Sequence, residues 1–281
     1  MGSLTGAKRG VGRAASGLAP WLEALARLGY AAKGIVYGVI GILALQAALG
    51  SGSPNVNQST AFQRIMTQPF GKFLLWIVLI GLIGYALWRL LQSVLDPEYE
   101  GRQKTGVIKR LGYFISGVTY LALAYLAYQI VQGRSTGSSG STSDITAKVL
   151  QIPGGQILVG LVGLVILGVG LFSIYSAYRK TFEKRFQYSQ MSAEERRWAL
   201  RLGRLGYAAR GVVFSLVGLF LIQAAVTYTP QKAGGLGGAL VALAGTPYGP
   251  YLLGLVAIGL IAFGGYCLAL ARYRQINLNL E

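Results

Sequence analysis

Six stretches of this sequence are long enough and apolar enough to cross a lipid bilayer. They occupy residues 28–49, 73–95, 111–132, 156–178, 205–227 and 251–272. Each holds the roughly 20 residues that a helix needs to cross about 30 Å of hydrocarbon. Because helices satisfy their own backbone groups in lipid and single strands do not, we expect six transmembrane helices in an all-α integral membrane protein. The low charged content of the chain, 12%, agrees with this expectation.

A short motif recurs three times, each time at the start of an apolar stretch. It reads RLGYAAKG, RLGYFISG and RLGYAARG, beginning at Arg27, Arg110 and Arg204. A proline stands 42 or 43 residues after each of these arginines, ahead of the next apolar stretch. This spacing predicts three tandem repeats, each a hairpin of two helices. Since every repeat has an even number of spans, all three insert the same way up, and we expect a pseudo-threefold axis along the membrane normal.

The repeats divide the chain into segments. We expect a basic tail at 1–24, repeat 1 at 25–97, a linker at 98–107, repeat 2 at 108–180, an amphipathic linker at 181–200, repeat 3 at 201–273 and a second tail at 274–281. Between the two spans of each repeat, apolar residues three or four apart predict a further short helix at the membrane interface, which ends near the proline.

Lysine and arginine are distributed unevenly between the two sides of the predicted membrane. Of the 26 residues of these types, 21 fall on the side of the two tails. This bias is the positive-inside signature, which places both termini in the cytoplasm. We expect a multi-pass protein of the cell (inner) membrane. The net charge of +17 is then a matter of topology and of attraction to anionic lipids on the cytoplasmic face. We therefore expect no nucleic-acid partner.

Two further segments belong to the repeat pattern. QPFGKFLLWIVLIGLIGYALWR and TPYGPYLLGLVAIGLIAFGGY form the second helices of repeats 1 and 3. With the RLGYAAKG and RLGYAARG openings, they make the chain resemble the bacterial membrane family called domain of unknown function 1206, over nearly its whole length. The resemblance implies three tandem two-helix units and carries no activity. The middle repeat departs most, with Phe114, Ile115 and Ser116 where the others have Ala, Ala and Lys or Arg.

Few side chains are suited to catalysis. The sequence has no histidine and a single cysteine, Cys267, so it offers no imidazole base and no zinc or iron-sulfur ligand set. None of the nine acidic residues falls within a predicted span, and Asp144 alone lies on the outer side. We expect no enzyme activity, no cofactor and no metal. Proton- or sodium-coupled transport is disfavoured because it usually needs a buried carboxylate.

Two cationic residues lie inside the predicted spans. Lys33 and Arg210 occupy the same repeat position, one to two turns into the first helices of repeats 1 and 3. In one interpretation, both side chains snorkel to the cytoplasmic headgroups. In the other, they face the interior of the bundle and form a cationic vestibule that favours anions.

Three glutamines recur nineteen residues after the three motif arginines, at Gln46, Gln129 and Gln223. A threefold arrangement would place their amides at one depth near the outer ends of the first helices, as a polar ring. They could hydrogen-bond to each other or to the outer loops, with about 1 kcal/mol per bond. Alternatively, they could line a narrow constriction or a ligand pocket.

Glycines also recur in the first helix of every repeat. Small residues let transmembrane helices approach closely. We expect helix-packing roles for Gly29, Gly34, Gly112, Gly117, Gly206 and Gly211.

These features favour a non-enzymatic membrane protein that acts by assembly or scaffolding. The alternative is a passive channel, or a permease for small solutes or anions, with a path along the pseudo-threefold axis. The connection at 178–204 is predicted either to lie on the inner leaflet as an amphipathic helix or to dock a protein partner. Its SAEE sequence predicts a capping box at Ser192 and Glu195.

Overall fold

The computed structural model describes residues 3–95, 104–134 and 142–274, and within these ranges the fold is helical. The linker predicted at 98–107 and the tail predicted at 274–281 lie largely outside the described residues. The elements are α1 (Ser3–Ala48), α2 (Gln58–Met66), α3 (Gly71–Leu95), α4 (Lys104–Val131), α5 (Thr142–Leu150), α6 (Gly155–Arg179), η1 (Thr181–Arg185), η2 (Tyr188–Gln190), α7 (Ala193–Val226), η3 (Pro230–Lys232), α8 (Leu236–Ala244) and α9 (Gly249–Tyr273).

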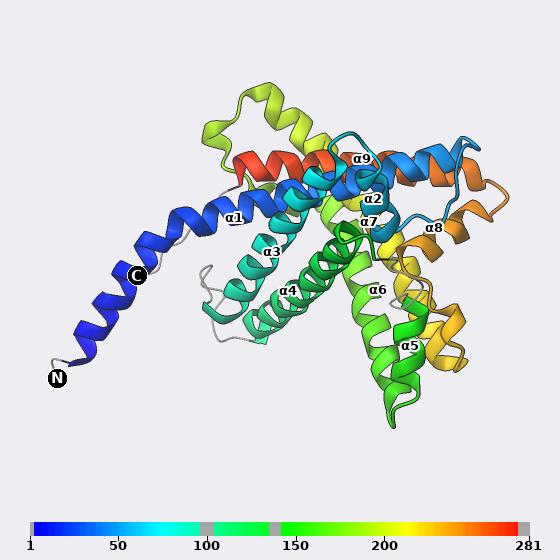
Figure 1. The fold of residues 1–281 in the computed structure, drawn as a ribbon, viewed down its shortest axis with the longest axis horizontal. Coiled ribbons are helices and arrows are strands. Elements are labelled where there is room, and N and C mark those ends of the chain that lie inside the picture. Colours follow the sequence, from blue (N-terminus) through cyan, green and yellow to red (C-terminus); the bar gives the residue numbers. More distant parts are fainter. Residues whose placement is uncertain (1–2, 96–103, 135–141, 275–281) are drawn as a thin grey trace.

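Six of the described helices are long and apolar enough to cross a membrane. The spans are Ala24–Ala48, Gly71–Val94, Arg110–Val131, Gly155–Arg179, Ala193–Val226 and Gly249–Tyr273. The prediction of an all-helical chain with six apolar helices is therefore confirmed. Figure 1 shows that α1 continues at its N-terminal end well beyond the other helices.

The three repeats contain the same succession of helices. The short helices α2, α5 and α8 each have 9 residues, and the longer α3, α6 and α9 each have 25. The predicted short helix is thus present in every repeat, while its place at the membrane interface stays a prediction. A glycine begins each longer helix because the corner is tight: a Cβ added at Gly155 would strike the carbonyl oxygen of Val149. Gly71 and Gly249 are confined in the same way.

The second helix of each repeat packs against the first helix of another repeat. α9 lies along α1, α3 along α4, and α6 along α7 (Figure 1). The first-helix glycines Gly34, Gly117 and Gly211 lie at these contacts, where an added Cβ would come 2.8 to 3.2 Å from a facing backbone oxygen. The three interfaces use equivalent residues, and the facing residues are Gly264, Ala86 and Gly170.

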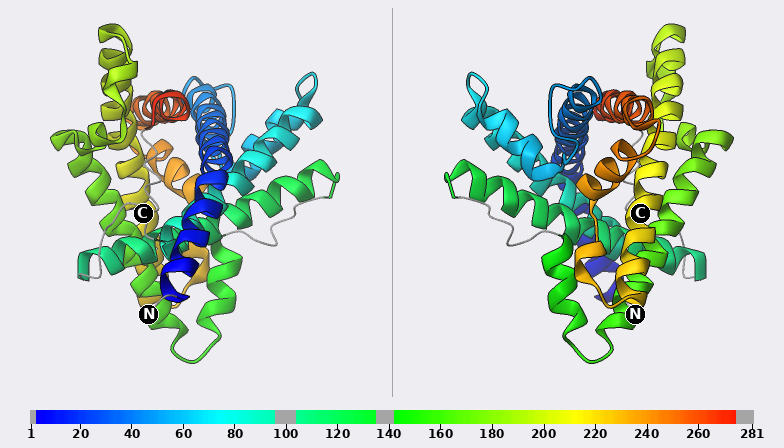
Figure 2. Two further views of the ribbon diagram at one scale, coloured as in Figure 1. Left: turned by 90° about the vertical axis from the view of Figure 1, so that its left-hand side faces the viewer. Right: turned by 90° about the vertical axis from the view of Figure 1, so that its right-hand side faces the viewer.

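The two helices of the hairpin also pack together in repeats 1 and 3, but not in repeat 2. Gly29 of α1 lies against Tyr85 of α3, and a Cβ added at Gly206 of α7 would come 2.5 Å from the Cα of Phe263 of α9. In the described residues, α4 and α6 form no comparable interface, and Figure 2 shows the outer end of α4 pointing away from α6. Beyond its own stretch of α4, no atom of the described residues lies within 4 Å of a Cβ added at Gly112, at the equivalent position. The packing role predicted for Gly112 is therefore wrong.

The sequence of repeat 2 explains why its hairpin is open. In repeat 1 an alanine of the first helix faces a glycine of the second, and a Cβ added at Gly81 would lie 2.7 Å from the Cβ of Ala32. Repeat 3 has the same pair of residue types. In repeat 2 the equivalent residues are Ile115 and Val165, which are 51% and 59% exposed. Their branched side chains prevent the close approach that alanine and glycine allow.

The α6–α7 connection at 178–204, predicted either to lie on the inner leaflet as an amphipathic helix or to dock a protein partner, is α-helical only in its second half, and both interpretations stay predictions. Two short 3₁₀ helices come first, and α7 then runs unbroken from Ala193 through its span. The predicted capping box is present, since the N–H of Glu195 donates to Ser192 Oγ at 3.2 Å and the N–H of Ser192 donates to Glu195 Oε2 at 2.9 Å. This cap starts the helix early, so that the last part of the predicted linker becomes the first turns of α7.

Replacing Gly206 or Gly112 by alanine tests whether the first helix of repeat 2 is unpacked at the position where that of repeat 3 is packed. We expect Gly206→Ala to destabilise the protein by about 1–3 kcal/mol, because the methyl group overlaps the backbone of Phe263. Gly112→Ala adds a methyl group to open space and replaces a poor helix former, so stability should stay equal or rise by up to about 1 kcal/mol. Thermal unfolding of both variants in detergent measures the difference. Equal destabilisation would show that α4 is packed at Gly112.

Candidate functional site

The ammonium group of Lys33 lies inside an aromatic cage. The side chain is 7% exposed, and its Nζ lies 5.3 Å from the ring centroid of Tyr85 and 5.5 Å from those of Tyr120 and Phe263. Lys33 is on α1, whereas the rings come from α3, α4 and α9. Of the two sequence-based interpretations, the inward orientation is the one that describes Lys33 in this structure.

Arg210 enters the same cage from α7. Its guanidinium carbon lies 4.6 Å from the ring centroid of Phe214 and 5.3 Å from that of Phe263. Lys33 and Arg210 both contact the ring of Phe263. The distance between Lys33 Nζ and the guanidinium carbon of Arg210 therefore cannot exceed the sum of their two distances to this ring. The Nε of Arg210 is enclosed without a hydrogen-bond partner among the described residues. The hydroxyl of Tyr37 lies next to the guanidinium group.

No carboxylate of the described residues forms an ion pair with either cation. The sequence keeps all nine of its acidic residues out of the apolar stretches. At the equivalent position of repeat 2 stands Ser116, which is partly exposed. Two positive charges therefore share one largely desolvated cluster, which we call the cation cluster.

The free energies of burial, ring contact and charge repulsion indicate that the cation cluster lacks an anionic partner. Removing an ion from water costs several kcal/mol even after relaxation. A desolvated cation–π contact offsets about 2 kcal/mol. Two like charges about 10 Å apart repel each other by about 2 kcal/mol at an effective dielectric constant of about 20. Lys33 has three such ring contacts and Arg210 has two, so the rings offset much of the cost of burial. The repulsion between the two charges remains, and an anion between Lys33 and Arg210 would remove it.

Aromatic side chains cover the cation cluster on the side of the α6–α7 connection. Tyr30 and Tyr207, at equivalent positions in repeats 1 and 3, are both buried. Phe182 of η1 stacks on Tyr207 with 5.2 Å between ring centroids and meets Tyr266 edge to face at 5.5 Å. The connection is therefore folded over this end of the bundle.

An apolar core fills the space on the opposite side of the cation cluster. The first helices of all three repeats contribute to one group of buried side chains. It contains Ile40 and Ala44 of α1, Ala124 and Ala127 of α4, and Val213 of α7. The cation cluster consequently lies between an aromatic layer and an apolar core.

Arg89 of α3 holds one wall of the cage in place. It donates to the hydroxyl of Tyr85 from Nε at 2.9 Å and from Nη2 at 2.6 Å. A third bond runs from its Nη1 to Gln92 Oε1 at 3.0 Å. Because Lys33 lies over the face of the same ring, Tyr85 contacts two cations at once, one through the ring and one through the hydroxyl.

Arg274, predicted to begin a cytoplasmic tail, is drawn into the aromatic layer. Its guanidinium carbon lies 4.8 Å from the ring centroid of Tyr30. Burial lowers the pKa of Arg274 to about 10, which still leaves it charged at neutral pH. The N–H of Gln187 donates to the carbonyl of Tyr273 at 2.9 Å. The backbones of Phe186 and Arg274 form an isolated antiparallel β-bridge. The end of α9 is thereby fixed against the α6–α7 connection.

The three glutamines of the predicted polar ring lie near the ends of α1, α4 and α7 in different surroundings. Gln46 and Gln129 are partly buried, and Gln223 is exposed. Each backbone carbonyl accepts a hydrogen bond from the turn that follows its helix. Within the described structure no hydrogen bond joins two of the three side chains. The polar ring stays a prediction.

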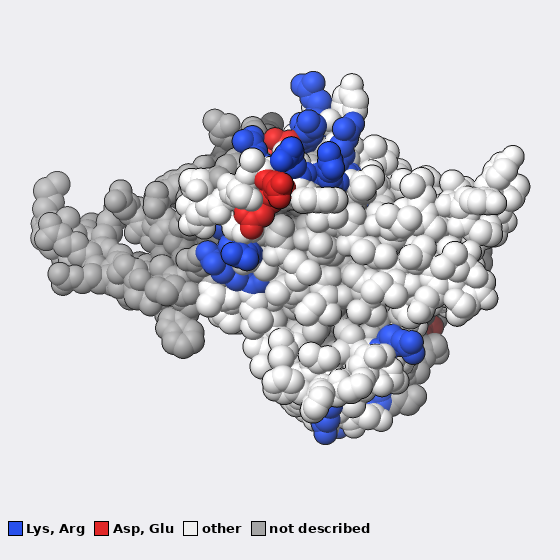
Figure 3. Space-filling view, turned by 90° about the horizontal axis from the view of Figure 1, so that it is seen from above, with Lys and Arg blue, Asp and Glu red and all other residues white. Residues whose placement is uncertain are grey.

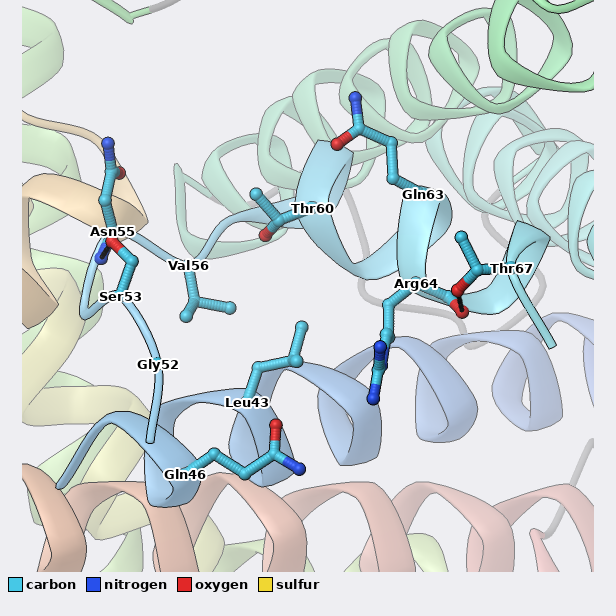
Figure 4. A pocket seen from close by; sticks show the side chains of 10 residues that line it. All are labelled: Leu43, Gln46, Gly52, Ser53, Asn55, Val56, Thr60, Gln63, Arg64 and Thr67. Atoms are coloured by element: carbon cyan, nitrogen blue, oxygen red, sulfur yellow. Dashed lines mark hydrogen bonds between the residues drawn. The ribbon is translucent and has the colours of Figure 1, made fainter. Parts of the chain in front are cut away.

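Gln46 also lines a cavity of about 290 Å³ between α1, the following loop and α2. Figure 4 shows the side chains of Gln46 and Arg64 extending into the space between the two helices. Its lining is mostly apolar, with further polar groups from Ser53, Asn55, Thr60, Gln63 and Thr67. This cavity is open to the surface, and it differs from the cation cluster in having no charge enclosed by rings.

Sequence reasoning identified both cations and missed the cage around them. Tyr85 and Phe263 lie on second helices, where an aromatic residue in an apolar stretch is usually part of the core. The available signal was that both stand at the same position, in repeats 1 and 3, the two repeats that carry a cation. Tyr120 comes from repeat 2, so only the packing of α3 on α4 brings it to Lys33.

Three segments of this chain match the family described as Domain of Unknown Function (DUF1206), at residues 28–96, 111–180 and 205–274. The chain belongs to this family. It is also 35% identical over 258 residues to the Uncharacterized protein YxxB of Bacillus subtilis (strain 168), across 92% of this chain and 93% of that protein. No solved structure matches. The resemblance inferred from the sequence motifs is confirmed, and the cation cluster is built from all three DUF1206 repeats.

We expect Lys33→Met to raise the stability of the ligand-free protein by about 1–3 kcal/mol, since it replaces an uncompensated buried charge with an apolar side chain of similar length. Lys72→Met is the control, because Lys72 is exposed at the start of α3 and its loss should change little. Thermal unfolding in detergent without multivalent anions compares the two variants. If Lys33→Met destabilised the protein, the ammonium group would already have a partner.

Proposed function

We propose that this protein is a non-enzymatic membrane protein that binds an anionic group between Lys33 and Arg210. The observation that carries the proposal is a pair of cations that share the ring of Phe263 without an ion pair to any described carboxylate. Charged residues inside membrane-spanning helices commonly mark ligand or ion sites. The hydroxyl of Tyr37, next to the guanidinium group, is a neutral donor for the same anion.

An anion held in the cation cluster would also serve the assembly role. The charged groups and rings of the cluster come from α1, α3, α4, α7 and α9. A bound anion would therefore connect helices of all three repeats, at the point where like charges otherwise repel. Binding would stabilise the folded bundle by mass action.

A channel along the repeat axis fits less well. The apolar core beyond the cation cluster takes residues from the first helix of every repeat. A permeating ion would have to leave the cluster and cross this core without polar partners, at a cost of several kcal/mol. The proposed site is thus closed on the side of the apolar core.

We further propose the topology that the charge distribution predicts. Both termini are cytoplasmic, the protein lies in the inner membrane, and the three repeats surround a pseudo-threefold axis along the membrane normal. The three equivalent interfaces between repeats support the axis. In Figure 3, Lys and Arg gather beside the α6–α7 connection, next to a broad face without charged side chains, as the topology requires. A C-terminal reporter that is active only in the cytoplasm tests the orientation.

Anion binding is measurable as a shift in thermal stability. At constant ionic strength, we expect inorganic phosphate and sulfate to raise Tm relative to chloride, and a concentration of 100 times Kd corresponds to about 2.7 kcal/mol. Lys33→Met and Arg210→Met should each abolish the shift. Arg204→Met, which removes an exposed cation of the same helix as Arg210, should retain it. A shift that persists in both cluster variants would place the anion elsewhere.

The channel alternative has its own measurement. Purified protein in liposomes should give no flux of chloride, potassium or small neutral solutes, because the apolar core blocks the axis. The comparison is the combined change Gln46→Leu, Gln129→Leu and Gln223→Leu. Flux in the unchanged protein that is lost in this folded variant would establish a conducting path through the glutamines and contradict the closed site.

A further inference from the structure

The geometry points to a specific class of ligand for the proposed site. We infer that the anionic group is the phosphate of a membrane lipid, which reaches Lys33 and Arg210 from the bilayer between α4 and α6. This inference rests on the proposed function, since it names the ligand of the same site.

The cage lacks a wall on the side of repeat 2. Tyr85 and Phe263 occupy equivalent positions in the second helices of repeats 1 and 3, and both are buried. The equivalent residue of repeat 2, Val169, is 40% exposed. Its helix, α6, makes no comparable interface with α4 in the described residues. The second helix of repeat 2 therefore contributes no ring to the cage and does not pack on α4 beside it.

The other approaches to the cation cluster are covered. On one side lies the aromatic layer, over which Phe182 and Phe186 of the α6–α7 connection are folded and buried. On the other side lies the apolar core shared by the three first helices. Around the bundle, α1 packs on α3 and α9, and α7 packs on α6 and α9. Among the described spanning helices, α4 and α6 are the neighbours without such an interface.

The edges of this open side suit hydrocarbon. On α4, Gly112 and Ile115 are exposed, and on α6 so are Val165 and Val169. The equivalent positions in repeats 1 and 3 are occupied by contacts between the two helices of the hairpin. An acyl chain that lies along these side chains would take the place of the missing helix contact.

The depth of the cluster is within reach of a lipid headgroup. Lys33 and Arg210 lie six residues beyond Arg27 and Arg204, a distance of about 9 Å along a helix. The polar headgroup region of each leaflet is itself about 5–8 Å thick. A lipid therefore has to sink by about one headgroup to place its phosphate at the cations, and its acyl chains can remain in the bilayer.

The donors match a phosphate in charge and shape. A guanidinium group presents a planar fork that pairs with two phosphate oxygens, and an ammonium group adds a compact point charge. Lys33 and Arg210 together carry two positive charges, and a phosphodiester or phosphomonoester carries one to two negative charges. The hydroxyl of Tyr37, next to the guanidinium group of Arg210, is a further neutral donor. One phosphate would thus neutralise the cluster without leaving a large excess of either sign.

Native mass spectrometry tests the inference on the full chain. The protein is placed in nanodiscs that contain equal amounts of phosphatidylglycerol and phosphatidylcholine, and it is then released and weighed with its retained lipids. We expect one phosphatidylglycerol held per chain. Lys33→Met and Arg210→Met should each lower its occupancy at least tenfold, whereas the exposed Arg204→Met should leave it unchanged.

A second variant tests the route between α4 and α6. Ile115→Ala with Val165→Gly restores the small pair found in repeats 1 and 3, and Val169→Phe supplies the ring that repeat 3 has at this position. We expect the triple variant to hold at least fivefold less lipid and to unfold at a higher temperature, since the hairpin of repeat 2 can then close. Unchanged occupancy in this more stable variant would overturn the route.

The outcomes distinguish a failure of the lipid inference from a failure of the proposed anion site. A phosphate-dependent shift in Tm without a retained lipid would overturn the lipid inference and leave the anion site in place. Retained lipid that is indifferent to both cluster variants would show binding to the outer surface only and would also overturn it. If neither free phosphate nor lipid responds to Lys33→Met and Arg210→Met, the proposed function falls together with the inference.

Discussion

Close approach of helix backbones at small residues is the constraint on which the rest of this structure depends. At Gly34, Gly117 and Gly211 an added Cβ would lie 2.8 to 3.2 Å from a facing backbone oxygen, so the three interfaces between repeats admit no larger residue without moving a helix. Helices in lipid gain little from burying apolar surface, and their association relies on such packing. The separation of α1, α4 and α7 follows from these contacts, and with it the space in which the cation cluster lies.

Repeat 2 departs from the pattern at the positions that would complete this arrangement. Ile115 and Val165 keep α4 and α6 apart, Ser116 stands where the other repeats have a cation, and Val169 stands where they have an aromatic ring. These residues are scattered along the sequence and lie on one side of the cluster in space. A departure spread over four positions thereby forms a single feature, an open side next to two cations.

The sequence predicts the elements well because each depends on a local pattern. The apolar stretches, the 9-residue helices and the cap at Ser192 follow from periodicity and turn chemistry within a few residues. The orientation of Lys33 depends on rings supplied by α3, α4 and α9, so no local pattern contains it. Gly112 is predicted as a packing residue because its repeat equivalents are, and the error comes from Ile115 on its own helix and Val165 on α6, which keep the two helices apart. Prediction from the sequence therefore succeeds for single helices. It fails where a contact depends on residues of two helices.

The number of charges in the cluster is itself informative. A third cation at the position of Ser116 would complete the repeat pattern and would add repulsion from both Lys33 and Arg210, about 2 kcal/mol for each at 10 Å and an effective dielectric constant of about 20. Arg89 already brings a positive charge to the hydroxyl of Tyr85, so a further cation at this position would exceed the charge that a single phosphate can neutralise. Two cations and a serine instead match a ligand with one or two negative charges. The serine also lies on α4, the helix that borders the open side, so the charge and the shape of the cluster favour the same ligand, one that brings its phosphate from the bilayer.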